Sequence, residues 1–180
     1  MTLTLRKIAI AILLTVSVST AAAELSEYQI KAEFIERFTR FVEWPESAAQ
    51  PSSTPFVIGV IGRDPFGVHL DTIARERTIK GRTVLIRRVK GLEDASSCEI
   101  LFISASERAR VGEIVARART RPVLTIGDSP GYLSAGVMIN LYTAENKIRF
   151  EINEQELARS GFQASAQLLK LARTSAPRKR

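Results

Sequence analysis

The sequence predicts a single three-layer α/β domain, in which a mixed, mostly parallel sheet of about six strands lies between helices. Short apolar runs alternate with amphipathic segments along most of the chain, and this order is typical of βαβ units in a parallel sheet. The last third instead has two runs joined by a tight turn, which indicates an antiparallel hairpin toward one edge. A chain of 180 residues is also the size of one domain.

Residues 1–23 have the layout of a secretory signal peptide. A short basic start precedes an apolar stretch of 13 residues and three alanines that end at Ala23. A membrane span needs about 20 apolar residues, so an uncleaved anchor is the less favoured alternative. We expect export to the periplasm, cleavage after Ala23, an α/β domain over residues 24–174 and a basic tail over residues 175–180.

The charge of the chain says little about its partners. The full sequence has 26 Lys and Arg against 19 Asp and Glu, a net charge of +7. Cleavage would remove two cations and no acid, and three of the remaining positive charges are Arg178, Lys179 and Arg180. An exported domain with so small a charge is not expected to bind nucleic acid. We expect the tail to be a solvated end, with weak contact to a membrane surface as the alternative.

A helix is expected directly after the signal peptide. Ser26 is placed as its N-cap, with Gln29 in the capping-box position. Aromatic and aliphatic side chains then recur at helical spacing from Ile30 to Val42. Trp44-Pro45 ends the helix, because a residue before proline avoids the α region. We assign this stripe to the core, with Trp44 as a lid over one edge of it.

Four short apolar runs predict the parallel strands. They are Phe56–Ile61, Thr83–Val89, Cys98–Ser104 and Val123–Ile126. Phe56–Ile61 is apolar throughout, as is typical of a strand buried on both faces. Asp64 and Pro65 predict a helix that runs to about Arg75, and residues 106–119 predict an amphipathic helix.

The C-terminal third is expected to contain the hairpin and two further helices. These elements are strands Val137–Tyr142 and Lys147–Ile152 and helices over residues 154–159 and 165–172. Glu145-Asn146 supplies the hairpin turn, and apolar and polar residues alternate along the second strand. Asn153 can cap the first of the two helices, and Gly161 ends it.

No pattern of residues indicates an enzyme, a metal or a cofactor. Residues 62–67 have the glycine spacing of a phosphate loop, but Val68 and His69 stand where that loop needs Lys and then Ser or Thr. A capped helix start is therefore favoured there over an anion site. His69 is the only histidine, and no nucleophile motif accompanies it. Cys98 has no second cysteine to pair with and is expected to be a small buried hydrophobic residue.

The carboxyl ends of the parallel strands form the default ligand crevice of an open α/β sheet. Small and polar residues gather at these ends. They are Gly62, Arg63, Asp64, Ser104, Gly127 and Asp128. A small polar ligand fits such a crevice, although turns favour the same residue types whatever the function.

Short motifs in a fixed order resemble the YfiR-like family of periplasmic proteins and cover nearly all of the mature chain. They are Tyr28–Ala32, Phe38–Pro45, Ile61–Gly67, Lys80–Arg82, Cys98–Ser104, Val123–Asp128, Gly136–Asn140, Arg149–Asn153 and Leu168–Ala172. Most of these residues are apolar or glycine, so they correspond to determinants of the fold and not to a site. Members of the family can use disulfides for redox control, and Cys98 departs from that pattern because it stands alone.

The resemblance implies a non-enzymatic regulator. Such a protein binds and represses the sensor domain of an inner-membrane diguanylate cyclase, and so lowers cyclic di-GMP and biofilm formation. We expect the end of the first helix with Trp44 to provide the partner contact, and a homodimer is left open. The alternative is a periplasmic small-ligand binding module that uses the strand-end crevice, and an enzyme with scattered carboxylates is the least favoured reading.

Overall fold

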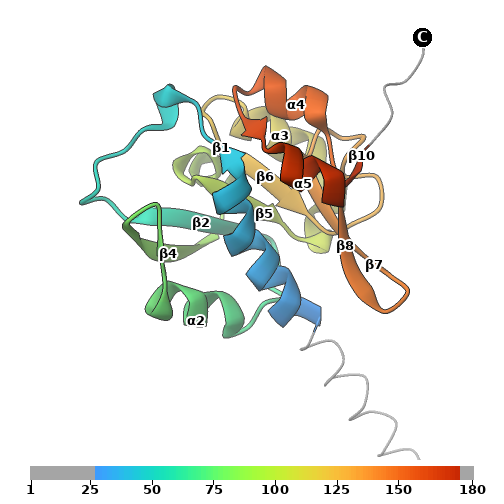
Figure 1. Ribbon diagram of the computed structural model, residues 1–180, viewed down its shortest axis with the longest axis horizontal. Helices are drawn as coiled ribbons and strands as arrows, with labels where there is room; N and C mark the ends of the chain where they lie inside the picture. The colour runs from blue at the N-terminus through green and yellow to red at the C-terminus, as the bar shows by residue number, and fades with distance from the viewer. Residues whose placement is uncertain (1–26, 175–180) are drawn as a thin grey trace, which may run out of the picture.

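The computed structural model describes residues 27–174, which form an α/β fold (Figure 1). A mixed, mostly parallel sheet lies between helices, which confirms the predicted fold class. The predicted signal peptide, the Ser26 cap and the tail over residues 175–180 lie outside the described residues. Within residues 27–174, no helix has the length and apolarity that a membrane crossing requires.

Six strands of four or more residues form the body of the sheet, and two strands of two residues lie at its edges. The longer strands are β2 (Phe56–Ile61), β4 (Arg82–Val89), β5 (Ile100–Ile103), β6 (Leu124–Gly127), β7 (Ile139–Ala144) and β8 (Lys147–Ile152). The short ones are β3 (Thr78–Ile79) and β10 (Arg173–Thr174). The order across the sheet is β10-β8-β7-β6-β5-β2-β4-β3, and β7 and β8 form the expected antiparallel hairpin.

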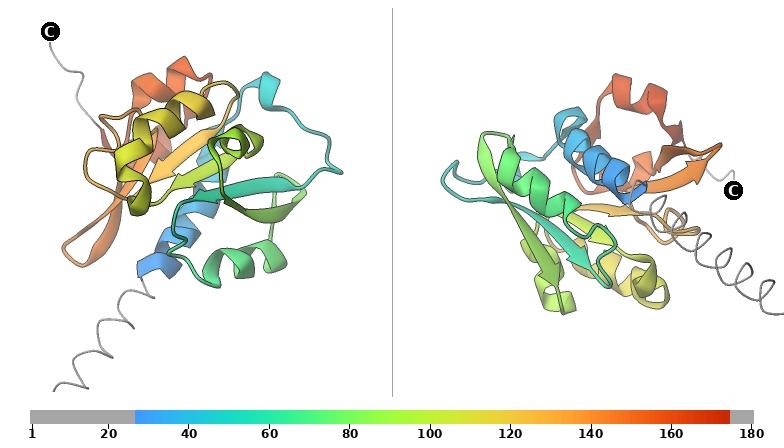
Figure 2. Two further views of the ribbon diagram at one scale, coloured as in Figure 1. Left: turned by 180° about the vertical axis from the view of Figure 1, so that it is seen from behind. Right: turned by 90° about the horizontal axis from the view of Figure 1, so that it is seen from below.

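Side chains of β2 alternate between two cores, one on each face of the sheet. Phe56, Ile58 and Val60 belong to one buried cluster, whereas Val57 and Ile61 belong to the other. All six residues of β2 are buried, as the apolar run predicted. The sheet is therefore the middle of three layers (Figure 2).

Different helices cover the two faces. The first face is covered by the N-terminal helix (residues 27–41), α2 (His69–Glu76), α4 (Glu154–Arg159) and α5 (Ala166–Leu171). The second is covered by α3 (Val111–Ala118) and the 3-10 helix η2 (Leu92–Ser97). This division places most of the helical residues on one side of the sheet, whereas the described chain ends in β10 at the edge of the sheet.

The N-terminal helix crosses the first face and packs against elements from the C-terminal part of the chain. The rings of Phe34 and Phe38 pack against Phe150 of β8, with centroid distances of 5.8 and 5.1 Å. At the end of the helix, β1 (Val42–Glu43) pairs antiparallel with β9 (Gln163–Ala164). The apolar stripe is core as predicted, except that Ile30 is 44% exposed.

The helix predicted from Asp64-Pro65 begins later than expected, at His69. Oδ1 of Asp64 accepts a hydrogen bond from the N–H of Phe66 at 2.8 Å, so this carboxylate closes a turn and does not cap the helix. Gly67 follows with a φ of 55°, in the left-handed region that interrupts a right-handed helix.

Other predicted boundaries are also displaced. The segment over residues 106–119 divides into the 3-10 helix η3 (Ala105–Arg110) and then α3, and Cys98 precedes β5 without belonging to it. β6 and β7 each begin slightly later than predicted, at Leu124 and Ile139.

Truncation of Phe38 tests the docking of the N-terminal helix. Phe38 is 1% exposed between the helix and β8. Phe38→Ala should lower the free energy of unfolding by about 3–5 kcal/mol, measured by urea denaturation, because it removes a buried ring and leaves a cavity. Ile30→Ala, on the exposed side of the same helix, is the matched control and should change little. Equal losses in the two variants would contradict the docking.

Candidate functional site

The residues predicted for a ligand crevice lie together at one edge of the sheet. Ile61 pairs with Ile103, and Ile103 pairs with Gly127, so β2, β5 and β6 end level with one another. The chain order also reverses between β2 and β5, because β4 pairs with β2 on its other side. Such a reversal is the usual position of a ligand in an open α/β sheet.

Asp128, just after β6, is bonded to the N-terminal helix. Its Oδ2 accepts hydrogen bonds from the hydroxyl of Tyr28 at 2.9 Å and from Nζ of Lys31 at 2.8 Å. Lys31 is only 3% exposed, and its Nζ also lies 2.7 Å from Oε1 of Glu27. A buried ammonium needs such multiple partners to offset its lost hydration. The carboxylate of Asp128, predicted to face a ligand, therefore binds the N-terminal helix to the edge of the sheet.

Tyr132 covers the neighbouring strand ends. Its hydroxyl donates to the carbonyl oxygen of Ser104 at 2.7 Å. Its ring lies so close to Gly127 that a Cβ at that position would collide with it. Burial raises the pKa of the Tyr132 phenol, so it remains a protonated donor at neutral pH.

The helix η3 closes the same edge over β2. The N–H of Arg63 donates to Oγ of Ser106 at 2.9 Å, and a Cβ at Gly62 would collide with that hydroxyl. Oδ2 of Asp64 accepts from Nε of Arg88 at 2.9 Å. A ligand at the carboxyl ends of the strands would have to displace these hydrogen bonds between residues of the protein.

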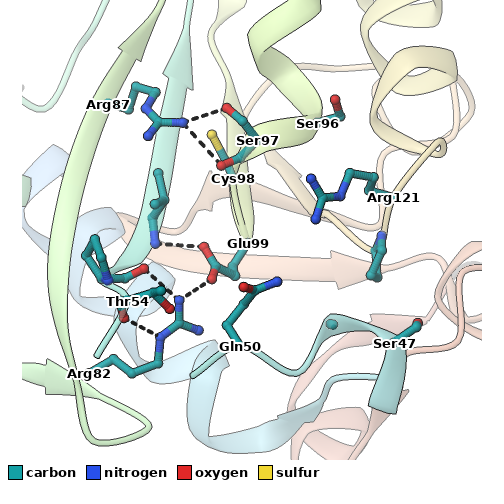
Figure 3. A pocket seen from close by; sticks show the side chains of 14 residues that line it. Ser47, Gln50, Thr54, Arg82, Arg87, Ser96, Ser97, Cys98, Glu99 and Arg121 are labelled. Carbon is teal, nitrogen blue, oxygen red and sulfur yellow. Dashed lines mark hydrogen bonds and ion pairs between the residues drawn. The ribbon is translucent and has the colours of Figure 1, made fainter. Parts of the chain in front are cut away.

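A pocket of about 360 Å³ opens at the opposite, amino edge of the sheet (Figure 3). Its wall comes from the connector before β2, the start of β2, two arginines of β4, and the residues that lead into β5 and β6. Side chains that matter for its chemistry are Gln50, Arg82, Arg87, Ser97, Cys98, Glu99 and Arg121. The sequence did not predict this pocket, because its residues come from separate segments and carry no common motif.

An ion pair between Arg82 and Glu99 forms the inner part of this pocket. Nη2 of Arg82 donates to Oε1 of Glu99, and Nε donates to the carbonyl oxygen of Thr54 at 2.8 Å. Oε2 of Glu99 accepts from the N–H of Val57 at 2.8 Å. Arg82 is 7% exposed, so the pair is shielded from water. Both carboxylate oxygens of Glu99 are therefore occupied by the protein.

Two further arginines line the pocket. Nη1 of Arg87 donates to Oγ of Ser97 at 2.6 Å and approaches the carbonyl oxygen of the same residue at 3.2 Å. Within residues 27–174, neither the guanidinium of Arg121 nor the side-chain amide of Gln50 has a hydrogen-bond partner. In Figure 3, both point into the space beside Glu99.

Cys98 lies at the wall of this pocket with its sulfur buried. A Cβ at Gly59 of β2 would reach its Sγ, so the thiol fills the space that the glycine leaves. Burial raises the pKa of the thiol, mainly through desolvation, with the nearby Arg87 acting in the opposite direction.

Trp44, predicted to contact a partner, is half-buried beside the start of β2. Its ring packs edge-on against Phe56 and Phe162, with centroids 5.8 and 5.5 Å away. Nζ of Lys80 lies 4.9 Å from the ring centroid. Its Nε1–H is buried and has no acceptor among residues 27–174.

His69, the single histidine of the sequence, lies at the start of a helix. It is the first residue of α2, in a cavity of about 190 Å³ that also contains Glu33 and Arg77. In the described part of the chain, His, Cys, Asp and Glu residues form no group of three or more that could bind a metal ion.

The burial of Cys98 predicts slow reaction with thiol reagents. A thiol with a raised pKa is mostly protonated near pH 8, and the thiolate is the reactive form. Labelling with a maleimide or disulfide reagent should be slow in the native protein and should accelerate sharply in denaturant. Fast native labelling would contradict this placement of the sulfur.

Two solved structures have the same kind of fold. A conserved domain protein from Vibrio cholerae O1 biovar El Tor str. N16961 has a TM-score of 0.58 at 11% identity, and the alignment covers 83% of this chain and 60% of that one. The ABC domain in complex with L-Trp from Streptococcus pneumonia has a TM-score of 0.54 at 11% identity, with coverages of 82% and 59%. This chain thus spans about 60% of the length of each. At this identity, the likeness concerns the fold alone.

The sequence comparison identifies the family. Among curated proteins, none matches this chain significantly. A family model described as YfiR/HmsC-like matches residues 28–173, which is nearly all of the described structure. This match agrees with the ordered motifs that run from Tyr28 to Ala172. The chain therefore belongs to the YfiR/HmsC-like family.

Proposed function

We propose that this protein is a non-enzymatic regulator that binds the periplasmic sensor domain of an inner-membrane diguanylate cyclase and represses it. The observation that carries the proposal is the family match over residues 28–173, since the family consists of periplasmic regulators of diguanylate cyclase signalling. Repression would lower cyclic di-GMP and with it biofilm formation. The export signal expected in residues 1–23 would bring the protein to the compartment of that sensor domain.

The end of the N-terminal helix with Trp44 is the proposed contact. Binding energy at protein interfaces concentrates in a few large side chains, and tryptophan is prominent among them. Trp44 is half-buried, so the residue keeps some accessible surface. Its Nε1–H is buried and lacks an acceptor within residues 27–174, so the contact would be made by the exposed surface of the residue and not by this donor.

A binding module at the carboxyl ends of the strands is the less favoured function. Three of its predicted residues already make hydrogen bonds within the protein. Asp128 accepts from Lys31, the carbonyl oxygen of Ser104 accepts from Tyr132, and Asp64 accepts from Arg88. A ligand there would have to compete with bonds inside the protein, some of them buried.

Deletion of the gene tests the proposed function. The deletion strain should contain more cyclic di-GMP and attach more strongly to surfaces, because the cyclase loses its repressor. The full-length gene should restore the original levels, and the recovered periplasmic protein should begin at Glu24. A version without residues 1–23 is the matched control, because it keeps the described domain but should remain in the cytosol and fail to rescue.

Unchanged cyclic di-GMP in the deletion strain would contradict this function. Rescue by the version without residues 1–23 would instead contradict the periplasmic site of action.

A further inference from the structure

We propose that the pocket at the amino edge of the sheet binds a small anion that carries carboxylate or phosphate groups. The proposal goes beyond the regulatory function and does not depend on it. The first observation is the charge of the lining, which contains three arginines, Arg82, Arg87 and Arg121, and a single carboxylate, Glu99. A concave site lined by one sign of charge concentrates ions of the opposite sign.

The single carboxylate does not neutralise the pocket. Glu99 is committed to Arg82 through one oxygen and to the N–H of Val57 through the other. Arg82 in turn donates to the carbonyl oxygens of Thr54 and Pro55, so it is held in place from several sides. This buried pair is a rigid inner wall. The charges of Arg87 and Arg121 are left without a carboxylate partner in the lining.

Arg87 and Arg121 keep donors that the described protein does not use. Arg87 donates to Ser97 through Nη1 alone, so its Nη2 and Nε groups make no hydrogen bond within residues 27–174. The guanidinium of Arg121 has no partner within residues 27–174. Guanidinium groups present paired N–H donors in a plane that matches carboxylate and phosphate oxygens. The geometry therefore favours an oxyanion over a neutral ligand.

The surroundings of the two arginines also suit such a ligand. Figure 3 shows Arg87 and Arg121 on opposite sides of the pocket, with the Gln50 amide below the space between them. Gln50 offers a further donor that has no partner in the described residues. A volume of about 360 Å³ lies at the lower end of the range for small-molecule sites, about 300–1,000 Å³. The ligand class is therefore a small mono- or dianion.

Calorimetric titration of the mature protein with two probes, inorganic phosphate and succinate, tests this site. Ionic strength is held constant with sodium chloride, so that general screening does not change. At least one probe should bind, and Arg121→Gln should weaken it about tenfold or more, because hydrogen bonds to a charged group are lost. Arg87→Gln, across the pocket, should also weaken binding, so the result does not depend on one variant.

Arg63→Gln is the matched control. Arg63 is an exposed arginine at the opposite edge of the sheet, and its replacement removes the same charge without touching the pocket. The control should bind the probe as the unmodified protein does, and thermal unfolding should show that all three variants are folded. The proposal is overturned if neither probe binds, or if Arg63→Gln weakens binding as much as Arg121→Gln. If Arg63→Gln weakens binding of the probe more than Arg121→Gln does, the anion binds at the carboxyl edge of the sheet instead.

Discussion

The structure depends on the docking of the N-terminal helix across one face of the sheet. Phe38 supplies the apolar contact in the middle of this helix, against Phe150. Lys31 supplies a buried ionic contact near its beginning, through Asp128. A buried ion pair stabilises a protein only when further bonds satisfy its members, and the hydroxyl of Tyr28 provides one here. Without this helix, part of the larger of the two cores would face water.

This docking has a consequence for where the protein can bind a ligand. The carboxyl ends of parallel strands usually form the ligand site of an open α/β sheet. Here Asp128 fastens the helix, and Tyr132 bonds to Ser104 at the same edge. The pocket with uncommitted donors lies at the amino edge, where Arg121 and Gln50 line it. The fold thus uses the customary site for its own stability.

Local patterns predicted the elements well, whereas long-range contacts could not be predicted from them. β2 has the predicted bounds, because a fully apolar run of six residues has few alternatives to a buried strand. The start of α2 was misplaced, because the sequence does not reveal that Gly67 adopts a positive φ. Tyr28 and Asp128 are 100 residues apart, and only the assembled sheet brings them together. The pocket around Arg82 and Glu99 was missed for the same reason.

The proposed function requires direct contact between this protein and a cyclase sensor domain. The most direct test is a titration of the purified mature protein into the purified periplasmic domain of the membrane diguanylate cyclase encoded nearest to its gene. The proposed function predicts saturable binding with a fixed stoichiometry. It also predicts weaker binding for Trp44→Phe, which keeps an aromatic ring on Phe56 and Phe162 but offers a smaller apolar surface to a partner. Absence of binding to this domain and to the other cyclase sensor domains of the host would contradict the account.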